Sequence, residues 1–506
     1  MKCRIAVISD IHYCATAPTI AARKGQWGAV LLRRTVERLN RTIKPDVTVV
    51  LGDLIDDPHD ADASALLVAL RDVLDRLDCP WLALPGNHDP SAAAFYNVFE
   101  RVEHLDVNGV RLVSFVDAEE PGYNASRRGD VLERMAAVAA DHSGPLVALQ
   151  HVPVAEPGGE ASYGYTNYAE VTTAMRAHGY TLALSGHYHP GVGLRQMDGL
   201  ATMVVPALCE APFSFALVTI DSVTIDGDNI GTGNIDAGNI DTEVLNHQLP
   251  ASLGLNDFHS HTQFAYCGED VSMTQSAGFA AIIGLNQLAF TEHSGQLYYD
   301  SQTYWSGDMA ARGIDGRTGR AERMADYWRA AAPHRGDAVF AGLEVDADFA
   351  GNLVAEPADL EQADIVLGAV HWLPALRTPQ PDAARAADEF LRIVDRLCRH
   401  GVDVLAHPFR VFRRGGIAVP TSLFAPTIAL LREHGVAAEI NFHTNEPPPP
   451  FIADCIEAGV RISFGSDAHA LYEVGEFHPD LGLLADIGFD GDLMDILLPP
   501  LTSSHG

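Results

Sequence analysis

The chain has little positive charge. Lys and Arg together number 34, against 67 Asp and Glu residues, so the formal net charge is -33. Binding to nucleic acid or to an anionic membrane depends on cationic side chains that neutralise phosphates, and a surface of this sign repels such partners. The composition therefore argues against long nucleic acids, although bound cations would cancel part of the charge locally.

Paired cysteines and long apolar runs are also missing. The seven Cys residues are scattered and form no CxxC, which favours a reducing cytoplasm. The N-terminal stretch MKCRIAVISD reaches Asp after a few apolar residues, too early for a signal peptide. No run approaches the roughly 20 apolar residues that cross a bilayer. We therefore expect a cytoplasmic protein without membrane contact, of unknown oligomeric state.

The sequence does have enough apolar residues, 47% over 506 positions, to build sizeable cores. A chain of this length usually divides into domains. Short apolar runs alternate with helical patterns, which predicts α/β layering in both halves. The Gly, Asn and Asp-rich segment DGDNIGTGNIDAGNID interrupts this pattern, so we expect a linker over 226–250 between domains at 1–225 and 251–506. The runs at 201–208 and 215–225 are expected to be edge strands that close the first domain.

Polar residues follow five apolar runs of the first half. The runs are RIAVIS, DVTVVL, WLALP, PLVALQ and TLALS. The residues that follow them are Asp10, His12, Asp53, Asn87, His88, His151, His187 and His189. Each short motif alone is typical of a capped turn or a loop, but α/β folds build their sites at the carboxyl ends of strands. A two-metal hydrolase needs such a converging set of His and carboxylate ligands.

The ordered set resembles the calcineurin-like metallophosphoesterases over about residues 1 to 220. Its motifs are SDIH, GDLID, GNHD, QHVP and SGHYHPG. The resemblance implies a four-layer α/β/β/α sandwich that holds two divalent ions of Mn, Fe or Zn. It implies ligands Asp10, His12, Asp53 and His189 for one ion, and Asp53, Asn87, His151 and His187 for the other. Asp53 would bridge the two ions.

Two ions about 3.5 to 4 Å apart lower the pKa of a shared water and neutralise charge on phosphorus oxygens. The leaving alkoxide still needs a proton. His88 is the candidate general acid, with Asp10 as a neighbouring carboxylate that could orient it. The loops after SDIH and GNHD look most like those of bacterial phosphodiesterases for cyclic nucleotides and glycerophosphodiesters.

The second half repeats the arrangement over seven strand candidates that end in polar residues. They are DFHSH, LAFTEH, VFAGLE, IVLGAVH, DVLAHP, AAEINFH and ISFGSDAH. This set resembles the polymerase and histidinol phosphatase (PHP) family over about residues 252 to 480, which implies a distorted (βα)7 barrel with a three-metal site. The implied ligands are His259, His261, Glu344 and Asp467 for the first metal, Glu344, His371 and His407 for the second, and His293 and His469 for the third.

One position departs from the PHP pattern. Cys267 stands where relatives have a His, and Glu269 follows two residues later. Cys is a competent soft ligand for Zn, and Glu269 is a harder one. Two alternatives stay open: a third metal with altered preference, or a binuclear site.

Arg410, Arg413 and Arg414 follow the AHPF motif in a chain that is otherwise poor in positive charge. An Arg fork binds two oxygens of a phosphate monoester at once, so Arg410 is a candidate catalytic residue and Arg410 and Arg413 are candidate substrate ligands. Arg414 is equally consistent with a solvated helix start. His443 either faces the substrate or packs.

The sequence thus predicts a bifunctional enzyme acting on a small phosphorylated substrate. The first domain would open a phosphodiester and the second would remove a phosphomonoester, in sequence. Two alternatives are a nuclease or nucleotide phosphatase acting on short nucleic acids, which the charge disfavours, and a metal-stabilised scaffold without activity.

Overall fold

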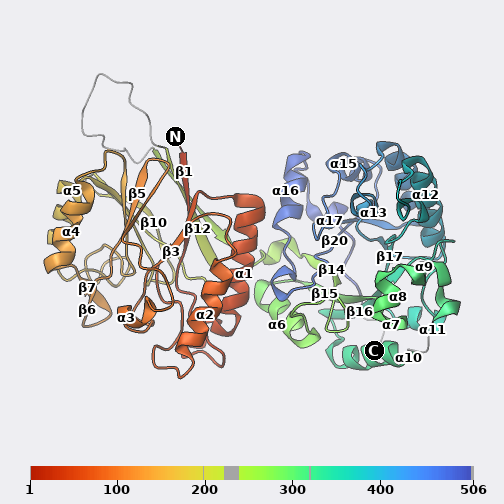
Figure 1. The fold of residues 1–506 in the computed structure, drawn as a ribbon, viewed down its shortest axis with the longest axis horizontal. Coiled ribbons are helices and arrows are strands. Elements are labelled where there is room, and N and C mark those ends of the chain that lie inside the picture. Colours follow the sequence, from red (N-terminus) through yellow and green to blue (C-terminus); the bar gives the residue numbers. More distant parts are fainter. Residues whose placement is uncertain (1, 198, 222–238, 318–320, 503–506) are drawn as a thin grey trace, which may run out of the picture. The chain divides into compact units, whose positions relative to one another are not determined.

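The computed structural model describes residues 2–197, 199–221, 239–317 and 321–502 (Figure 1). The chain divides into two compact units, Met1–Gln248 and Leu249–Gly506, each with its own core. The part of the expected linker at 226–238 lies outside the described residues.

Unit 1 is built from strands that form two main sheets and one hairpin. Its strands are β1 (Lys2–Ile8), β2 (Val47–Val50), β3 (Trp81–Ala83), β4 (His104–Val107), β5 (Val110–Ser114), β6 (Ala118–Glu120), β7 (Asn124–Ser126), β8 (Leu146–Leu149), β9 (Tyr180–Ser185), β10 (Val192–Met197), β11 (Leu200–Val204), β12 (Ser214–Asp221) and β13 (Ile240–Asn246). Its helices are α1 (Gly28–Arg38), α2 (Ala63–Leu74), α3 (Ala92–Phe95), α4 (Gly129–Ala139) and α5 (Tyr168–Ala177).

The two main sheets pack face to face. Their strand orders are β13-β12-β1-β2-β3 and β10-β11-β9-β8-β5-β4. Branched side chains such as Val7 and Val49 of the first sheet meet Leu112 and Leu182 of the second in one core. Helices α1 and α2 lie on one side of the sheet pair and α4 and α5 on the other, which gives four layers (Figure 1).

The strands that close unit 1 differ from the expectation. β12 lies inside its sheet between β13 and β1, and β11 lies between β10 and β9, so neither is an edge strand. The edge beside β12 is β13, which falls within the stretch expected to be linker. Ile240 enters the core from this strand, although its neighbours in sequence are mostly polar. Seven residues with only three apolar side chains carry too weak an alternation to predict a strand.

Unit 2 alternates parallel strands with helices. Its strands are β14 (Asn256–Ser260), β15 (Gln287–His293), β16 (Val339–Asp346), β17 (Val366–Ala369), β18 (Val404–Leu405), β19 (Ala437–Ile440) and β20 (Ile462–Phe464). Its helices are α6 (Met273–Ile283), α7 (Ser294–Tyr298), α8 (Ser301–Trp305), α9 (Asp308–Arg312), α10 (Ala321–Ala331), α11 (Pro357–Leu360), α12 (Ala383–Arg399), α13 (Arg410–Arg414), α14 (Phe424–His434), α15 (Pro449–Glu457), α16 (His478–Asp486) and α17 (Leu493–Ile496).

These seven strands form one parallel sheet in sequence order that nearly closes into a barrel. Ser260, at the end of β14, bridges in parallel to Ala468, which follows β20. The backbone N–H of Asp467 donates to the carbonyl of His259 at 2.7 Å. All seven carboxyl ends therefore point toward one rim of the barrel, where polar residues can converge.

Candidate metal centres

The residues expected at the N-terminal site come together beyond the carboxyl ends of strands from both sheets. Asp10 and His12 follow β1, Asp53 follows β2, Asn87 follows β3, His151 follows β8, and His187 and His189 follow β9. Every one of them except Asn87 and His189 is buried.

Asp53 occupies the centre of this N-terminal cluster. Its Oδ2 atom lies 3.5 Å from His12 Nε2 and 3.2 Å from His151 Nε2. On the His12 side, Asp10 Oδ1 lies 3.9 Å from His12 Nε2 and 3.6 Å from His189 Nε2. One carboxylate oxygen thus faces two separate groups of donors, as a bridging ligand would.

The contacts within each group suit a cation. His12 Nε2 and His189 Nε2 are 3.2 Å apart, and His151 Nε2 lies 3.1 Å from both His187 Nδ1 and Asn87 Oδ1. Asp10 Oδ1 is buried without a hydrogen-bond partner among the described atoms. Ligand atoms about 2.1 Å from one ion lie about 3 to 3.5 Å from one another. The residues present therefore fit divalent ions.

At three of these histidines the other ring nitrogen has a hydrogen-bond partner that fixes the ring, and at His12 a carboxylate lies near it. His189 Nδ1 lies 2.7 Å from Glu210, His151 Nδ1 2.7 Å from the carbonyl of Leu51, and His187 Nε2 3.0 Å from the carbonyl of Tyr123. Asp56 lies 3.5 Å from His12 Nδ1. Such partners are typical of metal-binding histidines, because they orient the ring and make the opposite nitrogen more basic.

The charges of the cluster differ from ring to ring: burial would lower the pKa of His151, but Asp53 and Asp10 raise it to about 10, so metal binding must displace a proton from this ring. Burial lowers the pKa of His12, and burial together with His151 lowers the pKa of His187 to about 4, which favours neutral rings. Burial alone would raise the pKa of Asp53, but His151 and His12 bring it well below the usual range. The bridging carboxylate is thus ionised.

The candidate acid His88 is oriented differently from the expectation. Its Nδ1 lies 2.8 Å from the carbonyl of Asp56, which leaves Nε2 free to face the cleft. Asp10 instead accepts hydrogen bonds at Oδ2 from the hydroxyl of Ser9 and the N–H of His187, and among the described hydrogen bonds none joins Asp10 to His88. The Asp56 carbonyl takes the orienting role that the sequence had given to Asp10.

Several of the clustered residues have strained backbones. The φ angle is 55° at Asp10, 45° at His12, 54° at Asp53 and 69° at His187. In the second unit it is 31° at His407 and 52° at Asp467. Left-handed backbone is rare outside Gly and Asn and persists where the surroundings enforce it, commonly at functional sites.

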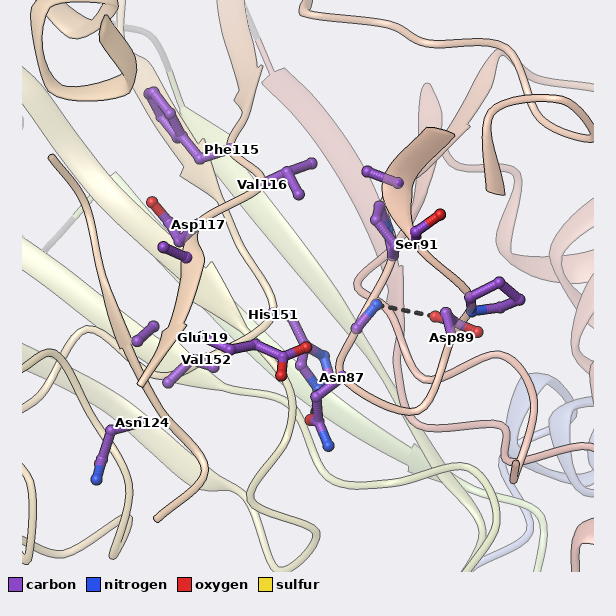
Figure 2. A pocket seen from close by; sticks show the side chains of 16 residues that line it. Asn87, Asp89, Ser91, Phe115, Val116, Asp117, Glu119, Asn124, His151 and Val152 are labelled. Atoms are coloured by element: carbon purple, nitrogen blue, oxygen red, sulfur yellow. Dashed lines mark hydrogen bonds between the residues drawn. The ribbon is translucent and has the colours of Figure 1, made fainter. Parts of the chain in front are cut away.

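Two cavities open at the N-terminal cluster. The first, here called the cleft, has a volume of about 260 Å³, and Asp53, Asn87, His88, Tyr163 and Arg23 are among its lining residues. The second, here called the side cavity, has a volume of about 390 Å³ and is bounded by Asn87, His151, Phe115 and Glu119 (Figure 2). Both are lined by Asn87, so the cluster lies between them.

In unit 2 the expected ligands converge at the rim of the barrel around Glu344. Its Oε1 lies 2.7 Å from His407 Nε2 and 3.3 Å from His371 Nε2. Its Oε2 lies 3.6 Å from His259 Nε2 and 3.7 Å from His261 Nε2, and it also contacts His293 Nδ1. One buried carboxylate therefore reaches five histidines, and its Oε2 has no hydrogen-bond partner among the described atoms.

Asp467 and His469 complete this C-terminal cluster. Asp467 Oδ1 lies 2.8 Å from His261 Nε2 and 3.5 Å from His259 Nε2. The nitrogens of His261, His293 and His469 lie within 4.8 Å of one another, an arrangement that could hold a further ion. Burial raises the pKa of Cys267 to about 12, and its Sγ lies 3.8 Å from His293 Nε2. Glu269 is exposed and, with Cys267 and His293, lines a cavity at the rim of the barrel.

The arginines after β18 separate in the structure. Arg410 is buried, and its Nη1 donates to Asp467 Oδ2 at 2.5 Å while its Nη2 lies 3.2 Å from His371 Nε2. Arg413 instead pairs with exposed Glu446 at 2.7 Å and does not line the cavity of about 370 Å³ at the rim. Arg414 does line it, because positions four apart share a helix face. Of the two arginines expected to bind substrate, Arg410 therefore lines this cavity and Arg413 does not.

His443 faces the same cavity. Its ring stacks on that of His469 with centroids 4.5 Å apart, and its Nδ1 lies 3.1 Å from Glu473. His443 therefore both packs on a candidate ligand and lines the cavity, so its contact with substrate stays a prediction.

Sequence reasoning missed the carboxylates that hold the histidines. They are Asp56, Glu210, Glu292, Asp346, Glu439 and Glu473. Glu439 Oε1 lies 2.7 Å from His259 Nδ1 and Asp346 Oδ1 lies 2.6 Å from His371 Nδ1. The available signal was an acidic residue inside an apolar strand, as in AAEI, since such residues are almost never buried unless paired.

Comparisons with known proteins agree with the first cluster. Residues 3–191 match the family described as calcineurin-like phosphoesterase. A Thermoanaerobacter protein named as a probable phosphatase is 25% identical over 250 residues, 47% of this chain and 88% of the relative. A Synechococcus protein named as a probable cyclic nucleotide phosphodiesterase is 26% identical over 206 residues, 37% of this chain and 74% of the relative.

Two solved structures are also similar. A dimetal phosphatase from Danio rerio is 17% identical, with a TM-score of 0.38, over 43% of this chain and 92% of its own. A candidate histidinol phosphatase from Listeria monocytogenes is 15% identical, with a TM-score of 0.35, over 44% of this chain and 99% of its own.

The family match, the phosphatase and phosphodiesterase relatives and the clusters define the class: the protein is a metal-dependent phosphoester hydrolase. Its N-terminal region carries a calcineurin-like phosphoesterase domain. Among the described residues, none of the helices combines the length and apolar character needed to cross a bilayer.

Proposed function

We propose that the chain is bifunctional. Unit 1 hydrolyses a phosphodiester of the cyclic nucleotide or glycerophosphodiester type, and unit 2, as a PHP-family phosphatase, removes the phosphate of the resulting monoester. The observation that carries the proposal is that each cluster is centred on one buried carboxylate, Asp53 or Glu344, shared between two groups of histidines. Relatives named as phosphatases and as a cyclic nucleotide phosphodiesterase support it.

In unit 1 the ligands would hold two divalent ions of Mn, Fe or Zn, which supply a hydroxide nucleophile and neutralise charge on the phosphoryl oxygens. The chain itself supplies the proton. His88 Nε2 faces the cleft while Nδ1 is engaged by the Asp56 carbonyl, so the ring is positioned to protonate the leaving oxygen.

In unit 2 the ligands would hold two or three ions of the same kinds. Arg410 and Arg414 lie on one face of α13 at the cavity beside the cluster, where two guanidinium groups can bind a dianionic phosphate. A monoester carries more negative charge than a diester, so this pair favours the second step over the first. His443, which lines the same cavity, would contact the same substrate.

Substitution of each central carboxylate tests this division. Protein loaded with Mn or Zn is assayed on a diester and on the corresponding monoester. We expect Asp53→Asn to lower diester hydrolysis by at least about 10³-fold and Glu344→Gln to do the same to monoester hydrolysis, each without effect on the other reaction. Asp72→Asn and Glu433→Gln, at exposed positions, are the matched controls. Loss of both reactions with one substitution would show that a single site does both.

A further inference from the structure

The side cavity is positioned to contact a substrate held at the N-terminal cluster. It is lined by Asn87 and His151, two of the expected ligands, and by Phe115 and Glu119 (Figure 2). Ala92 also lines it. Ala92 comes from α3, and Phe115 and Glu119 come from the segment after β5 and from β6. A volume of about 390 Å³ is that of a cavity for a small organic group.

The charges of this cavity indicate what it can bind. None of the described residues that line it is Lys or Arg. Asp117 is already engaged, because Arg127, which does not line the cavity, donates to its two oxygens at 2.8 and 2.9 Å. Glu119 is exposed, and its carboxylate points in the direction of Asn87 and His151 in Figure 2. A carboxylate repels an anionic group and accepts hydrogen bonds from hydroxyl groups.

The remaining lining fits the same kind of group. Ser91 and Asn124 offer further hydrogen-bonding atoms, while Phe115, Val116 and Val152 offer apolar surface. This mixture of a few polar groups on an apolar wall is typical of sites that fix a small ligand by orientation. A glycerol or pentose group has hydroxyls for the polar atoms and C–H faces for the apolar ones.

The position of Asn87 between the cleft and the side cavity assigns the two arms of a diester. His88, the candidate acid for the leaving oxygen, lines the cleft and does not line the side cavity. The leaving alcohol therefore belongs in the cleft, and the alcohol that stays on phosphorus belongs in the side cavity.

We propose that the side cavity binds the retained alcohol of a phosphodiester, and that this alcohol is uncharged and carries hydroxyl groups. This inference rests on the diesterase function proposed for unit 1. It adds a specificity site, with Glu119 as the residue that selects hydroxyls and rejects anions.

Three chromogenic diesters test the proposal. Each has p-nitrophenol as the leaving group, and the retained arm is methyl, glyceryl or carboxymethyl. For the wild-type protein loaded with Mn, we expect kcat/KM to be at least about tenfold higher for the glyceryl arm than for the methyl arm, and lowest for the carboxymethyl arm.

Two variants and one control act on the cavity. Ala92→Trp fills the side cavity and should lower the ratio of kcat/KM for the glyceryl diester to that for the methyl diester at least about fivefold. The kcat/KM for the methyl diester itself should change less than about twofold. Glu119→Lys should lower the same ratio and raise the rate for the carboxymethyl arm. Ala93→Trp, on the same helix but exposed and outside the lining, should leave all ratios unchanged.

The outcomes separate this inference from the function on which it rests. A wild-type protein that hydrolyses the diesters with a glyceryl to methyl ratio near one, or variants that leave the ratio unchanged, would overturn the assignment of the cavity and leave the diesterase intact. A protein that hydrolyses none of the diesters would overturn both.

Discussion

Most histidines of the two clusters direct one ring nitrogen at the cluster and the other at a carboxylate or carbonyl. His261 is an example: Nε2 lies 2.8 Å from Asp467, and Nδ1 lies 3.1 Å from Glu292. Glu292 also accepts hydrogen bonds from the N–H and hydroxyl of Thr262, so all its bonds favour the ionised form. The rigidity of these sites therefore depends on a layer of acids behind the ligands.

The lowered pKa of Glu292 predicts that the free energy of unfolding depends on pH. Burial alone would raise its pKa, but the hydrogen bonds and charge of His261 lower it from 4.5 to about 2. A depressed pKa stabilises the fold above pH 4.5, and this contribution is lost as the pH falls toward 2. Between pH 6 and pH 3, urea unfolding of metal-free protein should show that the wild type loses about 2 kcal/mol more than Glu292→Gln. Equal losses in the two proteins would contradict the prediction, and Glu433→Gln should behave like the wild type.

The close packing around Gly86 predicts that adding one methyl group at this position lowers activity. A Cβ at this position would lie 2.2 Å from Asp53 Oδ1 and 2.5 Å from its backbone nitrogen. Gly86→Ala must therefore displace the central carboxylate, and we expect diester kcat/KM to fall about 100-fold with a reduced metal content by atomic absorption. Gly193→Ala is the control, because its Cβ would meet no described atom within 4 Å. Unchanged activity in Gly86→Ala would contradict the prediction, because it would show that the loop around Gly86 accommodates the methyl group without displacing Asp53.

At the scale of elements, the sequence predicted strands correctly where an apolar run is followed directly by a His or Asp residue. Apolar runs followed by His or Asp located β1, β2, β8 and β9 and all seven barrel strands, because buried parallel strands are continuous apolar segments. It failed at β13, whose alternation is weak and whose partner β12 precedes the segment 222–238 in sequence. The orienting carboxylates were also missed, since Glu210 and Glu439 reach their histidines only through tertiary folding.

The strand β13 predicts an unequal response of two apolar residues. Ile240 is 7% exposed within the core between the sheets, whereas Val244 of the same strand is 43% exposed. Ile240→Ala should lower the free energy of unfolding of unit 1 by about 2 to 4 kcal/mol, and Val244→Ala by less than about 0.5 kcal/mol. Chemical denaturation followed by circular dichroism measures both. Equal small effects would mean that this segment behaves as a linker.

At the scale of the whole molecule, each unit has its own core and its own metal-binding cluster. Ions that bind the folded state alone stabilise it by mass action, so chelation should lower the melting temperatures of both units. For units of this size we expect shifts of about 5 to 10 °C in calorimetry. Asp53→Asn should remove the chelator effect from one transition and Glu344→Gln from the other. A single transition that responds to both substitutions alike would contradict this independence.

The left-handed backbone at Asp10, His12, Asp53, His187, His407 and Asp467 has a consequence for how this protein can change. At such positions glycine relaxes the chain, and removing a buried acid relieves crowding of charge. A laboratory selection for thermal endurance alone, with no demand for turnover, should therefore accumulate its first substitutions in these loops. The most heat-resistant variants from such a selection would be catalytically inactive.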